Sequence, residues 1–154
     1  MKGGYFLLIS VIAFMGSLFT TSFNLGNGSS YIGLMVLLLG WMGLGGEDGL
    51  VYISWCANPN LIISWILMLV VISVKKDKVL VSYFSLFFSL LSLVLSFSFL
   101  FQNPVEVYIN EAGHKSEITE LAVGYYFWLI SILVMVVGNI YVIYKNYRTQ
   151  NPAK

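Results

Sequence analysis

Long apolar runs separated by short clusters of charge dominate this sequence. They extend over about residues 4–20, 59–74, 80–101 and 124–144. About 20 apolar residues, rising roughly 1.5 Å each along a helix, cross the hydrocarbon core of a bilayer. The pattern therefore predicts an all-α membrane protein, a single integral membrane domain over residues 1–154 with four transmembrane helices. A cleaved signal peptide is the alternative for the first run, but no convincing small-x-small cleavage site with a polar flank follows it.

The charged residues predict the orientation of these helices, because lysine and arginine are retained on the cytoplasmic side of short loops. Lys75, Lys76 and Lys78 lie between the second and third runs, and the tail over residues 145–154 is basic. The loop over residues 102–123 carries four glutamates against the single Lys115. We expect both termini in the cytoplasm and this loop outside. Lys2 inside then requires an even number of crossings before Lys75.

The glycine-rich segment over residues 30–57 decides that number. A fifth crossing within it is one possibility, but the apolar stretch is short and its glycines make it a costly helix. We favour a helical hairpin or re-entrant excursion from the outer side, enclosed by protein. Glu47 and Asp48 fall in its "GGEDG" turn, which is either simply solvated or a carboxylate pair at a cavity mouth. Asn58 before Pro59 indicates a capped helix start.

Aromatic residues gather around this segment. Tyr52, Trp41, Trp55 and Trp65 are predicted at the outer membrane interface, where amphipathic rings are favoured. The motifs "GW" at Gly40, "WCANP" from Trp55 and "GYYFWL" from Gly124 resemble small polytopic bacterial membrane proteins with W-x-A-N-P and G-Y-Y-x-W-L signatures. That resemblance implies four membrane helices and the bacterial cytoplasmic membrane, and it implies no activity.

Two rows of small residues predict helix contacts. One helix face of the third run is lined by Ser82, Ser85, Ser89, Ser92 and Ser96. In the last run Gly124, Ser131 and Gly138 repeat every seven residues. Small residues let membrane helices approach closely and hydrogen-bond. We favour packing of the two rows on each other within one chain over packing on a partner, and a serine-lined pore is the functional alternative.

The acidic outer loop predicts a short β-hairpin. Val105, Val107 and Ile109 alternate with polar residues, the pattern breaks at "NEAGHK", and it resumes through Ile118. Gly113 is available for a positive-φ turn position. An isolated hairpin is only marginally stable, so we expect it to rest on the tryptophan-rich excursion and to form an acidic cap with it.

The composition, 58% hydrophobic and only 10% charged, is that of a bilayer protein. Cys56 and His114 are the only thiol and imidazole, and there is no metal-ligand spacing, nucleotide loop or basic nucleic-acid patch. We therefore expect no enzyme activity, no cofactor, no metal and no nucleic-acid partner. No acid or base lies within a predicted helix, which argues against proton-coupled transport.

Two functional hypotheses remain. The first is a non-enzymatic interaction protein, an accessory subunit of a membrane complex or an immunity-type protein that binds a protein partner at its outer face. The alternative is an oligomeric channel or small transporter using the excursion and the serine row. For the first hypothesis the candidate partner-binding residues are Trp41, Glu47, Asp48, Trp55, Glu106 and Glu111.

Overall fold

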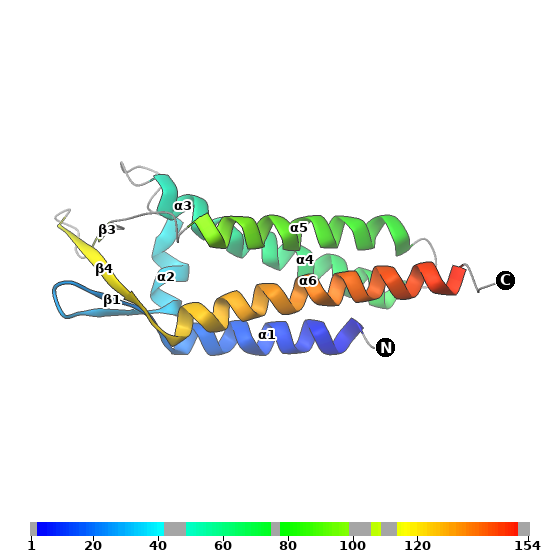
Figure 1. The fold of residues 1–154 in the computed structure, drawn as a ribbon, viewed down its shortest axis with the longest axis horizontal. Helices are drawn as coiled ribbons and strands as arrows, with labels where there is room; N and C mark the ends of the chain where they lie inside the picture. The colour runs from blue at the N-terminus through cyan, green and yellow to red at the C-terminus, as the bar shows by residue number, and fades with distance from the viewer. Residues whose placement is uncertain (1–2, 42–48, 75–77, 99–105, 109–113, 151–154) are drawn as a thin grey trace.

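The computed structural model describes residues 3–41, 49–74, 78–98, 106–108 and 114–150, and it is mostly helical (Figure 1). The helices are α1 (Gly3–Phe19), α2 (Gly33–Leu39), α3 (Gly49–Trp55), α4 (Ala57–Ser73), α5 (Lys78–Ser98) and α6 (Val123–Gln150). The strands are β1 (Thr21–Leu25), β2 (Ser30–Ile32), β3 (Glu106–Tyr108) and β4 (Lys115–Leu121).

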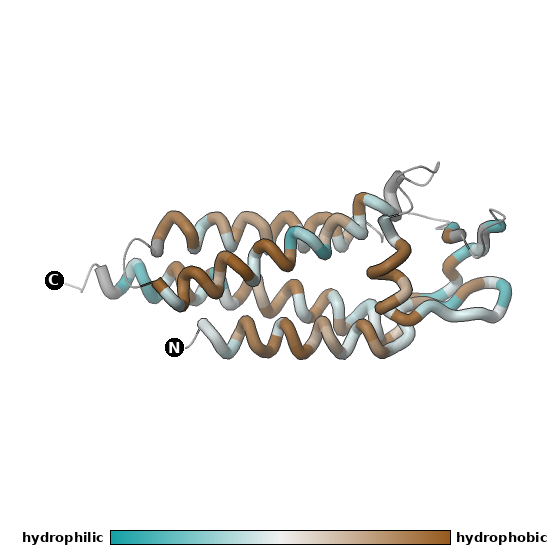
Figure 2. Tube along the Cα trace, turned by 180° about the vertical axis from the view of Figure 1, so that it is seen from behind, coloured by the Kyte–Doolittle hydropathy of each residue, from teal (hydrophilic) through white to brown (hydrophobic). Residues whose placement is uncertain are grey.

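Four helices, α1, α4, α5 and α6, run lengthwise beside one another as a bundle (Figure 1). Both ends of the chain lie at one end of this bundle, which we call the terminal end. The strands stand beyond the opposite end, which we call the sheet end. Apolar residues cover the helices, and the polar positions concentrate at the two ends and in the strands (Figure 2).

Three helical stretches are long and apolar enough to cross a membrane, namely Tyr52–Ser73, Val79–Ser98 and Val123–Arg148. Their outward side chains include Ile66, Phe84, Phe87 and Val94, as expected where lipid is the solvent. Helix α1 is also apolar, but it is shorter than these three. A membrane location follows from the three long helices, and the predicted first crossing stays a prediction.

The serine row of α5 faces the inside of the bundle. Ser82, Ser85, Ser89, Ser92 and Ser96 are all buried. Ser64 of α4 donates to the Ser85 carbonyl at 2.9 Å, and Ser85 donates back to the Ser64 carbonyl at 3.0 Å. Ser92 reaches the Ala57 carbonyl at 2.8 Å. Because serine is small, these hydroxyls bring α4 and α5 close enough to bond each other's backbone.

The small-residue row of α6 packs on a different helix. Gly138 lies against Phe6 of α1, and the Ser131 carbonyl accepts a hydrogen bond from Ser10 at 2.8 Å. Gly124 lies against the carbonyl groups of Thr20 and Thr21. The two rows therefore pack within one chain but not on each other. The α5 row contacts α4 and Asn139 of α6, and the α6 row contacts α1. Each row of small residues thus packs mainly against a different neighbouring helix.

The glycine-rich excursion holds two short helices. Helices α2 and α3 have seven residues each, about 10 Å of helix, so neither is long enough to cross a bilayer. Helix α2 runs across the sheet end of the bundle instead of alongside its helices (Figure 1). Its first residue, Gly33, lies on the Ser17 carbonyl of α1, a contact that leaves no room for a Cβ atom. Helix α2 thus lies over the bundle end.

Helix α4 begins differently from the prediction. It starts at Ala57 directly after α3, and its N-cap residue is Cys56, which makes no side-chain capping bond. Asn58 is instead the second helical residue and is buried. Pro59 occupies the first turn, where a missing N–H is tolerated. Asn60 donates its amide to the Cys56 carbonyl at 2.7 Å, so a side chain bonds the backbone at this junction.

A four-stranded antiparallel sheet, in the order β2-β1-β4-β3, caps the bundle. The predicted hairpin is present as β3 and β4, with its tip outside the described residues. Its strand β4 pairs with β1, a partner that the sequence did not predict. Part of the excursion over residues 30–57 joins the same sheet as β2. Strands β1 and β2 were not predicted. Their turn contains Asn27 and Gly28, and Gly28 has the positive φ of +83° that such turns require.

Candidate binding surface at the sheet end

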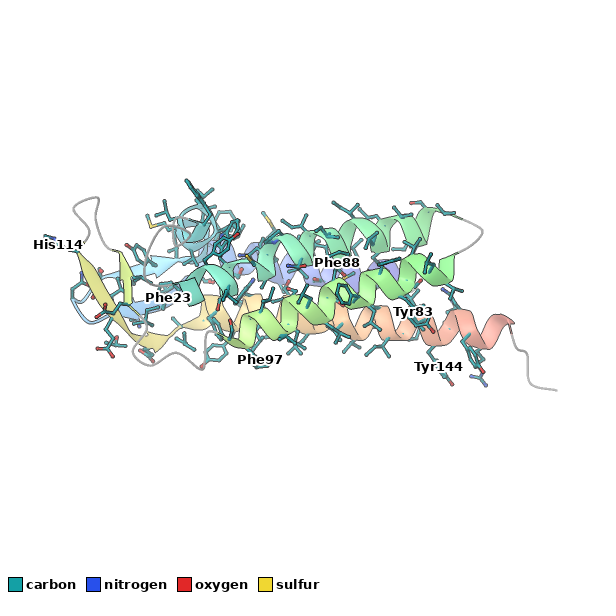
Figure 3. The ribbon with its side chains drawn as sticks, turned by 90° about the horizontal axis from the view of Figure 1, so that it is seen from above. Phe23, Tyr83, Phe88, Phe97, His114 and Tyr144 are labelled. Atoms are coloured by element: carbon teal, nitrogen blue, oxygen red, sulfur yellow. The ribbon has the colours of Figure 1, made fainter. Side chains whose placement is uncertain are left out.

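One face of the sheet is turned toward the bundle. Phe23 and Leu25 of β1 are buried there with Tyr125 of α6, and Val107 and Ile118 pack against them. Figure 3 shows Phe23 among the strands, next to the end of the bundle. Alternate residues of a strand point to opposite faces, so Asn24, between Phe23 and Leu25, faces away from the bundle. We call that second side the outward face.

A register irregularity collects carboxylates on the outward face. Asn24 pairs with Glu120, whereas Leu25 pairs with Ile118, so Thr119 is an extra residue in β4. A bulge of this kind shifts the alternation by one residue. Glu117 therefore points to the same face as Glu120, although regular alternation would place them on opposite faces. Asn24 donates its amide to the Glu120 carboxylate at 3.1 Å.

Glu106 adds a third carboxylate to the outward face. It is the direct cross-strand partner of Glu117 in the β3–β4 pair, and both side chains are exposed. Like charges directly opposite each other destabilise a strand pair. In the part of the chain that the structure describes, no salt bridge involving either carboxylate offsets this repulsion. The acidic cap expected from the sequence thus includes a pair of opposed carboxylates.

A cavity of about 70 Å³ lies beneath α2 at the sheet end. Helices α1, α2, α3, α4 and α6 and strand β1 contribute to its walls, which are mostly apolar and aromatic. The rings in these walls belong to Phe14, Phe23, Trp55, Tyr125 and Trp128. Gly40 of the α2 end lies so close to Trp55 that a Cβ atom would overlap the indole ring. Glycine at this position lets α2 lie directly over the cavity.

Hydrogen bonds hold the indole rings of the cavity in place. Trp128 donates its Nε1 proton to Asn58 Oδ1 at 2.8 Å, and Trp55 donates to the Leu37 carbonyl at 2.8 Å. Each bond joins two elements, α6 to α4 and α3 to α2. The indole N–H groups of both rings therefore have hydrogen-bond acceptors within the protein.

The predicted partner-binding residues are distributed unevenly over this end. Trp41 is exposed at the end of α2, whereas Trp55 is half-buried in the cavity wall. Glu106 lies on the outward face of the sheet. Glu47, Asp48 and Glu111 lie outside the described residues. Among the described residues, Glu106 thus belongs to the outward acidic face and Trp55 to the aromatic cavity, and the expected joint surface stays a prediction.

Trp65 is not at the outer interface as predicted. It lies halfway along α4 and donates its Nε1 proton to the hydroxyl of Ser10, halfway along α1, at 2.9 Å. A tryptophan next to a small polar residue can satisfy its N–H inside the bundle, and it then needs no interfacial position. Sequence spacing alone shows no such partner, because the two residues are far apart in the chain.

A second polar cluster surrounds Asn139 of α6 in the bundle interior. Its amide nitrogen lies 3.2 Å from Ser64 Oγ, 3.3 Å from the Ser85 carbonyl and 3.1 Å from Ser89 Oγ. Its Oδ1 atom is buried and has no hydrogen-bond partner among the described residues. The amide thus ties α6 to the serine row of α5 and to α4. No ionisable group takes part in this cluster.

The only thiol and the only imidazole occupy different parts of the fold. Cys56 lies at the junction of α3 and α4, and His114 is exposed at the far tip of the sheet (Figure 3). Within the described residues, no three His, Cys, Asp or Glu side chains form a group that could hold a metal ion. In its described part, the sheet end therefore offers surfaces for binding and no group of metal ligands.

Sequence reasoning missed three features of this end, and only one of them had a local signal in the sequence. The Asn27–Gly28 pair between short polar–apolar stretches is a hairpin signature that could have identified β1 and β2. The bulge at Thr119 and the Trp128–Asn58 bond had no such signal, because both depend on residues distant in the chain.

None of the protein-family models, curated proteins and solved structures compared with this chain matches it. The resemblance based on W-x-A-N-P and G-Y-Y-x-W-L accordingly stays a prediction. The functional argument rests on the geometry of the sheet end.

Proposed function

We propose that this protein is a non-enzymatic integral membrane interaction protein that binds a basic protein partner through the outward face of its sheet. An accessory subunit of a membrane complex and an immunity-type protein both fit this description. The observation that carries the proposal is the sheet itself. Two loops that are distant in the chain combine beyond the helix ends into one sheet whose outward face bears Glu106, Glu117 and Glu120.

The opposed pair of Glu106 and Glu117 supports an external role for this face. Direct opposition of like charges destabilises a strand pair. Folding of the chain alone gains nothing from it. A partner that brings lysine or arginine side chains would turn the repulsion into attraction, and complementary charge also raises the rate of association.

The proposal includes an orientation. We place α1 as the fourth crossing, because it packs along α6 and its 17 residues span about 25 Å. Both termini are then cytoplasmic in a bacterial cytoplasmic membrane, with the sheet outside. This arrangement agrees with lysine and arginine near the terminal end and carboxylates in the sheet.

The channel alternative has less support. A pore lined by the serine row would require these hydroxyls to face a water path. All five are buried within the single chain, and Ser85 and Ser92 bond the backbone of α4. Ser89 and Ser96 bond carbonyl groups of their own helix.

The test is substitution of Glu117 by lysine, which replaces a like pair with an opposite pair across β3 and β4. We expect the melting temperature to rise slightly, because opposed unlike charges stabilise a strand pair by about 0.2–1 kcal/mol. We expect the amount of partner cross-linked and co-purified from native membranes to fall. If Glu117 has only a structural role, the melting temperature and the amount of partner recovered should rise or fall together.

Arg148→Glu is the matched control, since it reverses an exposed charge at the terminal end. It should leave partner recovery unchanged. If Glu117→Lys keeps its partner while Arg148→Glu loses it, the binding surface lies at the terminal end and the proposal is wrong.

A further inference from the structure

The aromatic cavity beneath α2 has a feature that the proposed function does not use. Its walls include one amide, that of Asn58, among rings such as Trp55, Tyr125 and Trp128. Asn58 is 93% buried, since its exposed fraction is 7%. Its Oδ1 atom accepts the Trp128 proton, which fixes which end of the amide is the donor. Among the described residues, Asn58 Nδ2 has no hydrogen-bond partner.

The other polar groups of the wall are mostly occupied. The Trp55 indole is bonded to the Leu37 carbonyl, Ser54 is 2.9 Å from Ser98, and Ser17 bonds the Phe14 carbonyl at 2.6 Å. The Asn58 amide and the Ser22 hydroxyl, which both line the wall, are left for a ligand. A matching ligand has an apolar body and one hydrogen-bond acceptor, because a buried donor favours a partner and the apolar walls exclude charge.

The depth of the cavity indicates where such a ligand comes from. Its walls lie at the sheet-end termini of α1, α4 and α6. In the proposed arrangement with four crossings, this is the level of the boundary between headgroups and hydrocarbon. Helix α2 lies across this level and exposes Met35, Leu38, Leu39 and Trp41. An apolar helix that lies in the plane of the interface contacts acyl chains directly.

We infer that this cavity binds the ester end of a phospholipid acyl chain. The ester carbonyl oxygen accepts a hydrogen bond from Asn58 Nδ2, and the first methylene groups lie against Trp55 and Trp128. The volume of about 70 Å³ agrees with this fragment. A cavity of about 150 Å³ holds benzene, so roughly half that volume takes a carbonyl group and two or three carbons.

The test compares two phosphatidylcholines that carry the same brominated chains, one with ester links and one with ether links that lack the carbonyl oxygen. Each is titrated in mixed micelles against protein carrying Trp41→Phe, which removes the exposed indole. Bromine quenches the fluorescence of nearby tryptophan, here Trp55 and Trp128. Trp65, halfway along α4, adds a background that is common to both lipids. We expect saturable quenching by the ester lipid, with half-saturation at a roughly 3- to 10-fold lower mole fraction than for the ether lipid.

Val36→Phe tests the location, because Val36 lines the cavity and a larger ring fills it. It should abolish the saturable quenching at an unchanged melting temperature. Leu39→Phe is the matched control on the exposed side of α2 and should quench like the parent. Equal half-saturation by ester and ether lipids overturns recognition of the carbonyl. Quenching that follows only the bulk lipid fraction, in parent and variants alike, overturns the site. The ester–ether comparison uses no cavity variant and decides the question if Val36→Phe fails to fold.

Discussion

At the scale of single residues, several buried serines of this protein form hydrogen bonds across helix contacts. Ser10 bonds the Ser131 carbonyl, Ser64 bonds the Ser85 carbonyl, and Ser92 bonds the Ala57 carbonyl. A hydroxyl that found no acceptor in an apolar surrounding would cost several kcal/mol against a paired one. Serine therefore serves both as a small contact residue and as a bond between neighbouring backbones.

The hydrogen bonds of Asn139 give a prediction at the scale of single residues. Asn139→Leu should change the free energy of unfolding by no more than about 1 kcal/mol, because replacing a hydrogen-bonded group by an apolar one of similar shape is nearly neutral when its partners stay satisfied. Ser64, Ser85 and Ser89 each keep another bond. The change also removes the unpaired Oδ1 atom. Thermal unfolding in detergent measures the effect.

Asn139→Asp is the contrasting variant, since it keeps the shape but replaces the donor with an acidic oxygen facing the Ser85 carbonyl. We expect it to destabilise the bundle by roughly 3 kcal/mol or more, as an uncompensated buried charge does. Equal melting of the two variants would mean that water reaches this cluster from the bilayer surface.

At the scale of elements, close approach explains the arrangement of the helices. Gly33 and Gly40, at the two ends of α2, contact the α1 backbone and the Trp55 ring so tightly that a side chain has no place. Gly138 makes the equivalent contact between α6 and Phe6 of α1. These glycines set which elements touch, although they are poor helix formers.

The buried serine face of α5 gives a prediction about close helix packing. Ser89→Leu should destabilise the protein by roughly 1–3 kcal/mol, because a larger side chain overpacks a contact that is now fully buried. Leu90 is the neighbouring control, 42% exposed on a side turned away from the bundle. Leu90→Ala should cost less. Equal melting temperatures of the two variants in detergent would place Ser89 against lipid or water and contradict the contact.

At the scale of the whole molecule, the sheet joins the two loops that leave the same end of the bundle. Strand β1 follows α1 directly, and β4 leads directly into α6. Because α1 and α6 pack along each other, their sheet-end termini bring β1 and β4 into pairing distance. The position of the sheet is thus a consequence of helix packing.

The topology prediction belongs to this scale. On a Cys56→Ser background, Asn27→Cys in the β1–β2 turn should react with a membrane-impermeant thiol reagent added outside intact cells. Arg148→Cys should react only after the cells are opened. Both sites are exposed in the structure, so access depends on the side of the membrane alone. Labelling of Asn27→Cys only from the cytoplasm would establish an odd number of crossings before Lys75.

The sequence by itself determined the class of this protein and the position of its long helices. Apolar length is a local property, so the runs that became α4, α5 and α6 were visible without any partner. The inward side of α5 was also visible, because five serines at helical spacing mark one face whatever packs on it. The hairpin of β3 and β4 followed from local alternation in the same way.

Only the tertiary structure decided which surfaces meet. The α6 row packs on α1, the hairpin pairs with β1, and Trp65 donates a hydrogen bond to Ser10 inside the bundle. These contacts join residues that are distant in the chain, and they are set by how all the helices pack together. The bulge at Thr119 is of the same kind, since only pairing with β1 shows that Glu117 and Glu120 share a face. Hydrophobic pattern specifies an element and its buried side, whereas shape and hydrogen-bond complementarity specify its neighbour.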